Sequence, residues 1–220
     1  MKTFHELQEG LYDHNIFKAF FLAGGPGSGK SYVAMRAISG TGLKTINSDD
    51  AFEHLLKKAG LSLKMPPKEI EPRDVVRARA KKVTAAKEKN YLEGRLGLII
   101  DGTGRDANKI LSQKAKLEEL GYDTYMIFVN TSLDVALERN ADRPRSVAEP
   151  IVVTRHKDVQ ANIGKFSNMF RTGFIVVDNN NVGDDVFKEV YKRVKGLLRR
   201  KVQNTRAKDW MASELAKKQR

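Results

Sequence analysis

The sequence of 220 residues contains no cysteine and only one tryptophan. The absence of cysteine excludes a disulfide scaffold, thiolate-bound zinc, an iron–sulfur cluster and a cysteine nucleophile. No run approaches the ~20 consecutive apolar residues of a membrane helix, and residues 1–7 lack the apolar core of a secretory signal. We therefore expect a soluble, cytoplasmic protein without a membrane partner.

Basic residues are abundant: 40 Lys and Arg against 27 Asp and Glu give a net charge of +13. This excess favours polyanionic partners such as nucleic acid or nucleotides. It is concentrated in residues 184–220, where twelve Lys and Arg face five Asp and Glu. We expect one domain over residues 1–183 and a basic helical extension over residues 184–220, either packed on that domain or trailing from it. The extension is either a solvated appendage or a nucleic-acid-binding patch, and its charge favours neither.

Apolar strand-like runs alternate with helical patterns along the chain, which is typical of a parallel sheet covered by helices. We expect helices over residues 30–38, 49–59, 72–93, 106–120 and 132–140, and a helical C-terminus broken near residue 204. We expect strands over residues 18–23, 44–47, 96–100, 123–129 and 174–177. The predicted fold is a three-layer α/β sandwich with a five-stranded parallel sheet.

The strongest motif is GGPGSGKS at Gly24–Ser31, which matches the P-loop pattern G-x-x-x-x-G-K-[ST] between a predicted strand and a predicted helix. Its glycines let successive backbone N–H groups point at phosphate oxygens, and the helix adds its positive N-terminal dipole. We expect Lys30 to neutralise the β- and γ-phosphates and the Ser31 hydroxyl to bind Mg²⁺. The phosphate-binding residues are Gly25, Gly27, Ser28, Gly29, Lys30 and Ser31. These features predict an ATP–Mg²⁺ site in a P-loop NTPase-type fold.

Asp101 ends the apolar run LGLII, so its carboxylate should emerge at the carboxyl edge of the sheet. If that strand adjoins the first, Asp101 can hold Mg²⁺ directly or through water. An ordinary turn or helix-cap residue is the alternative. Thr103 and Arg105 follow in a flexible turn over the same edge, where we expect them to contact the substrate.

Asp49 and Asp50 follow the second predicted strand, again at a carboxyl edge. A kinase that acts on an alcohol needs a carboxylate to orient the hydroxyl and accept its proton. We expect Asp49 to be this general base and Asp50 to contact the substrate. The alternative is that Ser48 or Asp49 only caps the following helix.

Three arginines, Arg139, Arg143 and Arg145, lie in a segment that ends in prolines. Guanidinium groups can fork across phosphate oxygens, and on a mobile segment they would close over ATP and exclude water. We expect catalytic and phosphate-binding roles for Arg139 and Arg143. The alternative is solvated arginines paired with Asp142 and Glu138.

These motifs together resemble the P-loop kinase branch that contains bacteriophage-type polynucleotide kinases and zeta-toxin-like kinases. The resemblance covers residues 19–177 in order and is carried, besides GGPGSGKS, by INSDD, IIDGTGR, LERNADR and EPIVV at residues 46–50, 99–105, 137–143 and 149–153. It implies that the domain over residues 1–183 is a P-loop kinase domain, that Asp49 is the general base and that Arg139 and Arg143 contact the triphosphate. The polynucleotide kinases carry an arginine three residues after the acid, where it meets the acceptor phosphate. This chain has Phe52 there.

The sequence and the resemblance together indicate an ATP–Mg²⁺-dependent kinase that phosphorylates a hydroxyl group. The acceptor is either a nucleic acid or a nucleotide-like or sugar-containing small molecule. The basic residues Arg73, Arg77, Arg79, Lys81 and Lys82 on the long predicted helix favour nucleic acid. A nucleotide-gated ATPase that phosphorylates no acceptor is the other function the motif allows.

Overall fold

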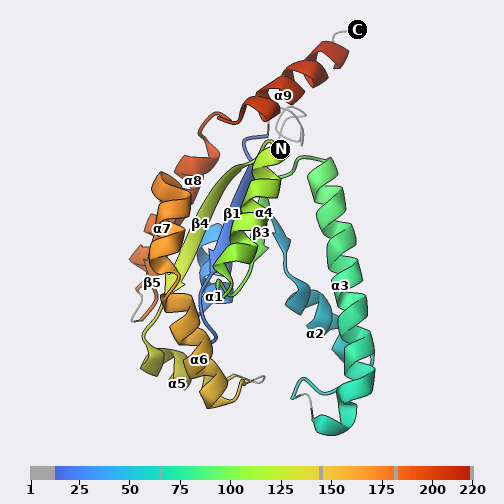
Figure 1. Ribbon diagram of the computed structural model, residues 1–220, viewed down its shortest axis with the longest axis vertical. Coiled ribbons are helices and arrows are strands. Elements are labelled where there is room, and N and C mark those ends of the chain that lie inside the picture. The colour runs from blue at the N-terminus through green and yellow to red at the C-terminus, as the bar shows by residue number, and fades with distance from the viewer. Residues whose placement is uncertain (1–12, 65, 144–145, 181–182, 219–220) are drawn as a thin grey trace, which may run out of the picture.

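A computed structural model describes residues 13–64, 66–143, 146–180 and 183–218 (Figure 1). Its centre is a five-stranded sheet in the order β2-β3-β1-β4-β5, in which every pair is parallel. The strands are β1 (Lys18–Ala23), β2 (Lys44–Ile46), β3 (Leu98–Asp101), β4 (Asp123–Asn130) and β5 (Phe174–Asp178). The predicted α/β fold with a five-stranded parallel sheet is confirmed.

Helices cover both faces of the sheet. On one face α4 (Ala107–Glu119), α6 (Glu149–Gln160) and α7 (Ile163–Phe170) pack over Phe21 and Phe128. On the other face α1 (Lys30–Val33) and α8 (Asp184–Leu198) pack over Phe20 and Ile127. Strand residues alternate between these two cores because successive side chains of a strand point to opposite faces. The molecule therefore has three layers.

The first helix is shorter than expected. The sequence predicts one helix over residues 30–38, but α1 ends at Val33 and the chain continues as a π-helix, η2 (Ala34–Ile38). The wider π turn still buries Ala37 and Ile38 in the core, so the apolar pattern is preserved. The sequence pattern does not reveal the π-helix, because the apolar residues of this segment still face the core.

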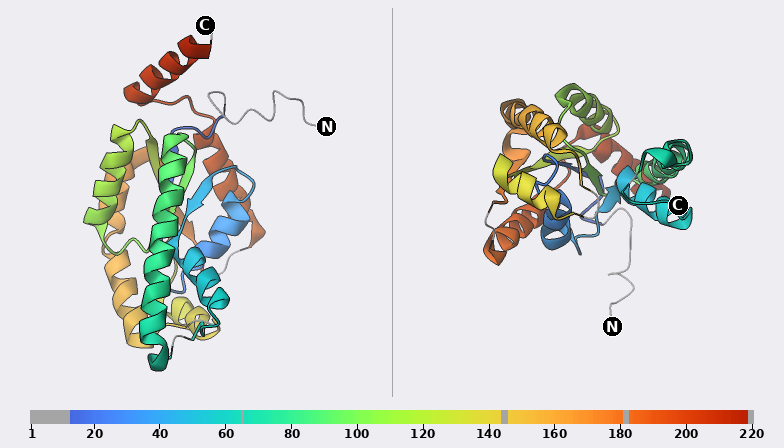
Figure 2. Two further views of the ribbon diagram at one scale, coloured as in Figure 1. Left: turned by 90° about the vertical axis from the view of Figure 1, so that its right-hand side faces the viewer. Right: turned by 90° about the horizontal axis from the view of Figure 1, so that it is seen from below.

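Helices α2 (Ser48–Lys58) and α3 (Ile70–Glu93) lie side by side at the β2 edge, and α3 stands apart from the helices on the sheet (Figures 1 and 2). A short 3₁₀ turn, η3 (Pro67–Glu69), leads into α3. The pair has its own small core, made by Phe52, Leu56 and Ala80. We call α2 and α3 the α2–α3 arm.

In the C-terminal segment, α8 packs on one face of the sheet, and the helix after it projects beyond the end of the sheet (Figure 1). Helix α8 buries Phe187 and Val194 in the core, although it lies beyond the domain limit expected at residue 183. Helix α9 (Thr205–Lys218) buries Ala207 and packs Trp210 edge-on against Phe17, with 5.3 Å between ring centroids. Together α8 and α9 continue the structure of the main domain.

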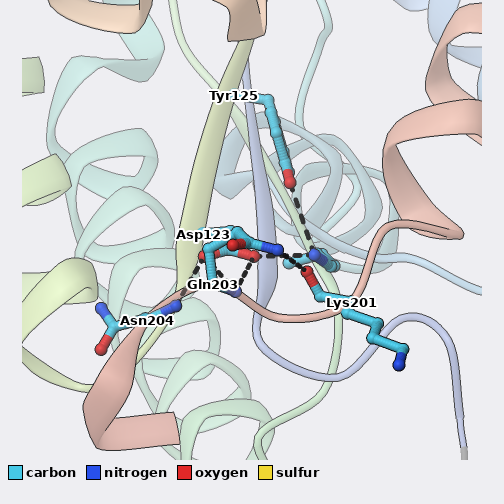
Figure 3. A network of polar contacts seen from close by, with 6 residues as sticks. Asp123, Tyr125, Lys201, Gln203 and Asn204 are labelled. Carbon is cyan, nitrogen blue, oxygen red and sulfur yellow. Dashed lines mark hydrogen bonds and ion pairs between the residues drawn. The ribbon is translucent and has the colours of Figure 1, made fainter. Parts of the chain in front are cut away.

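A polar network holds the chain just before α9 (Figure 3). The carboxylate of Asp123, at the start of β4, accepts hydrogen bonds from the backbone N–H groups of Gln203 and Asn204 at 3.1 and 3.2 Å. The same carboxylate pairs with the buried Lys18 ammonium, 2.7 Å away. Lys18 is the first residue of β1, and Asp123 is the first residue of β4. The tail therefore docks at the edge of the sheet where the amino ends of these two strands lie. This edge lies opposite the carboxyl ends of the strands.

Helix α5 (Leu133–Ala141) follows β4, and the 3₁₀ turn η4 (Arg171–Gly173) leads into β5. In the part of the chain that the structure describes, no helix has the length and apolar character needed to cross a lipid bilayer.

Candidate active site

The P-loop joins the carboxyl end of β1 to the start of α1. Gly27 and Gly29 have φ angles of 76° and 80°, in the left-handed region that favours glycine. A Cβ atom on Gly27 would overlap the backbone carbonyl oxygen of Ala136 in α5. The motif glycines are therefore required both by the turn and by the close approach of α5.

The loop leaves a set of polar groups available to a ligand. None of the described residues accepts a hydrogen bond from the backbone N–H groups of Gly25, Gly27, Gly29, Lys30 or Ser31. The Ser28 hydroxyl is buried, and no partner for it lies within the described part of the chain. Unpartnered buried donors are costly, so this cradle fits an anion that would satisfy them. The residues present fit a polyphosphate.

Lys30 folds back over the loop. Its Nζ atom donates to the carbonyl oxygen of Gly24 at 2.7 Å and lies 3.4 Å from that of Gly25. Burial lowers the pKa of Lys30, while the nearby Asp101 carboxylate opposes that shift. The Lys30 ammonium therefore lies over the P-loop, where the carboxylate of Asp101 at the end of β3 acts on it.

Asp101 is placed as the sequence predicts, because β3 pairs with β1 and brings Asp101 opposite Leu22. The Asn47 side-chain amide donates to Asp101 at 2.8 Å and to Asp50 at 3.2 Å, and so bridges the two carboxylates. Desolvation by burial raises the pKa of both Asp50 and Asp101. Ser31, Asn47, Asp50 and Asp101 line a cavity of about 370 Å³ beside α1. The proposed magnesium ligands Ser31 and Asp101 therefore border the same space.

Asp49, the expected general base, lies at the start of α2. The alternative of a helix cap is excluded, since Asn47 occupies that position and accepts from the Asp49 backbone N–H at 2.7 Å. The Asp49 carboxylate accepts from Nη1 of Arg77 in α3, at 2.7 Å. Asn47 accepts from the Asp49 N–H and donates to Asp101, so this asparagine links the start of α2 to the carboxyl end of β3.

The arginines of the expected lid have different surroundings. Arg139 in α5 donates to the carbonyl oxygens of Asn179 and Asn180, at 2.6 and 2.9 Å, beside the P-loop. It would have to leave these carbonyls to reach a triphosphate. Arg143 is exposed, and its charge acts on Lys30. Arg145 lies outside the described residues.

The expected substrate contacts after β3 lie in an anchored loop. The Thr103 carbonyl accepts from the Gly24 N–H at 3.1 Å, and Asn162 of the α6–α7 turn donates to the carbonyls of Gly104 and Arg105. The side chains of Thr103 and Arg105 remain exposed. The loop therefore joins the P-loop to the α6 side of the site and leaves both side chains available to a substrate.

Sequence reasoning missed the residues that support the P-loop from behind. Asn179, after β5, donates to the Ser28 carbonyl at 2.7 Å, and the Thr131 hydroxyl donates to the same carbonyl at 3.1 Å. The backbone of His156 in α6 packs against Gly25. Asn179 lies in a polar run with the composition of a turn, and no spacing rule links it to a loop 151 residues away.

The sequence profile of the AAA domain family matches residues 20–164, from β1 into α7. This chain belongs to that family. The match includes the P-loop, the carboxylates, Arg139 and Arg143, and with the sheet it shows a P-loop kinase-like domain. No curated protein sequence matches the chain significantly.

Solved structures share the fold at low identity. A candidate kinase from Chloroflexus aurantiacus is 16% identical, with a TM-score of 0.50 over 82% of this chain and 98% of that one. A chain of the Pnkp1/Rnl/Hen1 RNA repair complex is 22% identical, with a TM-score of 0.53 over 70% and 48%. A chain of the AvrRxo1-ORF1:AvrRxo1-ORF2 complex is 14% identical, with a TM-score of 0.57 over 79% and 63%. At these identities the likeness shows the fold alone.

Proposed function

We propose that this protein is an ATP- and Mg²⁺-dependent kinase that transfers the γ-phosphoryl group to a hydroxyl group. The observation that carries the proposal is the arrangement of Lys30 and Asp49. Lys30 folds over the backbone amides of the P-loop, and Asn47 links the start of α2, which carries Asp49, to Asp101 on the strand beside β1. A phosphate-binding loop alone would serve any NTPase, whereas a carboxylate beside it serves an alcohol acceptor.

The phosphates would be held by the N–H groups of the loop, the Ser28 hydroxyl and the Lys30 ammonium. Ser31 and Asp101 would hold Mg²⁺, which supplies positive charge that stabilises the phosphates during transfer. Arg143, which follows α5, would add positive charge to the phosphates. Arg139 would do so after leaving the carbonyls of Asn179 and Asn180.

Asp49 would orient the acceptor hydroxyl and take its proton as the oxygen bonds to phosphorus. The bond between the γ-phosphorus and the bridging oxygen breaks, and ADP leaves with that oxygen. Asp50 and the exposed side chains of Thr103 and Arg105 border the same edge and would contact the acceptor.

The acceptor is a nucleic acid or a smaller nucleotide-like or sugar-containing molecule. Resemblance to polynucleotide kinases and the basic surface of the α2–α3 arm support the first. Of the basic residues of α3 named above, Arg79, Lys81 and Lys82 are exposed, whereas Arg73 and Arg77 are half-buried. These residues therefore do not form one uniformly exposed nucleic-acid track.

Tracing labelled γ-phosphate tests the proposal. The full chain is incubated with labelled ATP, Mg²⁺ and panels of 5′-hydroxyl oligonucleotides, nucleosides and nucleotide sugars. We expect label to join one acceptor class covalently, and the Asp49→Asn variant to lose this transfer while keeping its ATP affinity. Label that appears only as free phosphate with every acceptor would identify an ATPase instead.

A further inference from the structure

The general base of the proposed reaction has one ion-pair partner among the described residues, and that partner comes from another helix. Arg77 lies in the middle of α3 and donates through Nη1 to Oδ1 of Asp49, 28 residues earlier, at 2.7 Å. Its guanidinium carbon stands 4.4 Å from the centroid of the Phe52 ring. Phe52 is buried in the small core of the α2–α3 arm. The arm therefore presents a cation directly beside the carboxylate.

The ring fixes where the guanidinium lies. A cation over an aromatic face is attracted by the ring's negative face, and a planar guanidinium stacks there without losing its in-plane donors. Arginine carries five N–H donors, and Asp49 engages one nitrogen of Arg77. The remaining donors can hold a second acceptor group while the first bond is kept. This geometry suits the forked recognition of a phosphate or carboxylate.

The pair is also open to an incoming molecule. The side chains of Arg77 and Asp49 are 36% and 54% exposed. An ion pair this exposed is weak, because water screens it and two long side chains must be held in place. A ligand that offers an anionic group to Arg77 and a hydroxyl to Asp49 would replace the water around both side chains.

We propose that Arg77 recognises an anionic group of the acceptor, a phosphate or carboxylate adjacent to the hydroxyl that is phosphorylated. The inference rests on the proposed function and adds the chemical class of the acceptor. Arg77 binds the anion, Asp49 takes the proton of the neighbouring hydroxyl, and Phe52 keeps the guanidinium between them. Neutral alcohols lack the group that Arg77 binds and are poor acceptors.

Matched acceptors test this directly. Adenosine and adenosine 3′-monophosphate present the same 5′-hydroxyl, and only the second carries a phosphate. A 5′-hydroxyl oligonucleotide carries the same phosphate within a polymer. Comparing it with adenosine 3′-monophosphate distinguishes a nucleic acid acceptor from a mononucleotide acceptor. We expect kcat/KM for adenosine 3′-monophosphate to exceed that for adenosine at least tenfold. Equal values would overturn the inference, although kinase activity itself would stand.

Arg77→Gln keeps the polarity of the position and removes the charge. We expect this variant to raise KM for the phosphorylated acceptor about tenfold, and so to lower the preference for adenosine 3′-monophosphate over adenosine by about the same factor. Arg77→Lys should recover part of the preference. Arg79→Gln is the matched control, since Arg79 is exposed two positions along the same helix and lies on another side of it.

A loss of kcat that is equal for both acceptors would show that Arg77 only positions Asp49, and would overturn its role in recognition. A binding measurement is independent of turnover: with ADP and Mg²⁺ saturating the P-loop, adenosine 3′-monophosphate is titrated into the wild type and into both variants. We expect weaker binding to Arg77→Gln alone. Free phosphate as the only labelled product would instead reject the kinase proposal.

Discussion

The Nζ atom of Lys18 lies 2.7 Å from Oδ2 of Asp123 and has no exposed side-chain surface. The hydroxyl of Tyr125 is 3.4 Å from the same ammonium, and burial raises the pKa of Tyr125 to about 12, so that hydroxyl stays neutral. Asp123 is therefore the counter-ion of a fully buried cation. Because the same carboxylate accepts the N–H groups of Gln203 and Asn204, it joins strand pairing to the docking of the tail.

The first prediction concerns this ion pair. Asp123→Asn leaves the Lys18 ammonium buried without a counter-ion, and we expect the free energy of unfolding to fall by about 3 kcal/mol. Urea unfolding followed by circular dichroism measures the loss. The double variant Lys18→Met with Asp123→Asn removes the orphaned charge and should recover stability. A loss below about 0.5 kcal/mol in the single variant would mean that the pair is not needed.

The second prediction concerns α9. Deletion of residues 204–220 removes Ala207 and Trp210 from their contacts with Phe17, and we expect a loss of about 2 kcal/mol or more. ATP affinity should be unchanged, because the tail docks at the amino ends of the strands, opposite the P-loop. Calorimetric unfolding and ATP titration measure the two properties. Unchanged stability would make the tail a solvated appendage, and lost ATP affinity would connect it to the site.

The fold was largely predictable because its signals are local. Apolar runs predict all five strands, and the rule that ligands bind at carboxyl edges predicts the edge at which Asp101 emerges. Its position next to β1 follows from the pairing of β3 with β1, which the structure shows. The glycines of the P-loop were identified from their spacing, and the structure shows a positive φ at Gly27 and Gly29. Patterns of this kind depend on neighbours a few residues apart.

The contacts that the sequence did not reveal join residues far apart in the chain. Nothing in the run KAFFLA names Asp123 as the partner of Lys18, although a lysine inside an apolar run signals that a counter-ion is needed. The pairing of Asp49 with Arg77 depends on how α3 packs on α2. Hydrophobic periodicity predicts each helix but not how two helices pack together. The charge of the tail does not predict whether it docks, whereas its docking depends on Ala207 and Trp210.

The third prediction concerns Lys30. Lys30→Ala removes the ammonium that lies over the loop, and we expect phosphoryl transfer to fall about 10²-fold or more. Steady-state assays with labelled ATP measure the rate, and circular dichroism shows whether the fold is kept. Lys44→Ala, on the edge strand β2, is the control for loss of a lysine. Wild-type activity in Lys30→Ala would remove the assignment of Lys30 to the phosphates.

The fourth prediction concerns pH. Burial raises the pKa of Asp101 above its value in the unfolded chain, so the neutral carboxyl stabilises the fold. That contribution is complete below the unfolded pKa and is lost as pH rises through the raised folded pKa. Asp101→Asn cannot lose a proton there, and we expect the ligand-free variant to be more stable than the wild type at neutral pH. The difference should disappear in acid.

Thermal unfolding across pH, without nucleotide or metal, measures this difference. Adding ATP and Mg²⁺ should then stabilise the wild type more than Asp101→Asn, because the carboxylate would gain a metal partner. A variant that is less stable than the wild type at neutral pH would mean that the charged form of Asp101 supports the fold.

The central claim is that the backbone amides of the P-loop hold a polyphosphate. Amide chemical shifts of the ¹⁵N-labelled full chain, recorded during titration with ADP and Mg²⁺, test it most directly. We predict that the largest changes fall on Gly25, Gly27, Gly29 and Lys30, while the indole N–H of Trp210 at the opposite edge stays unmoved. Saturable binding that leaves the signals of these four residues unchanged would contradict the account.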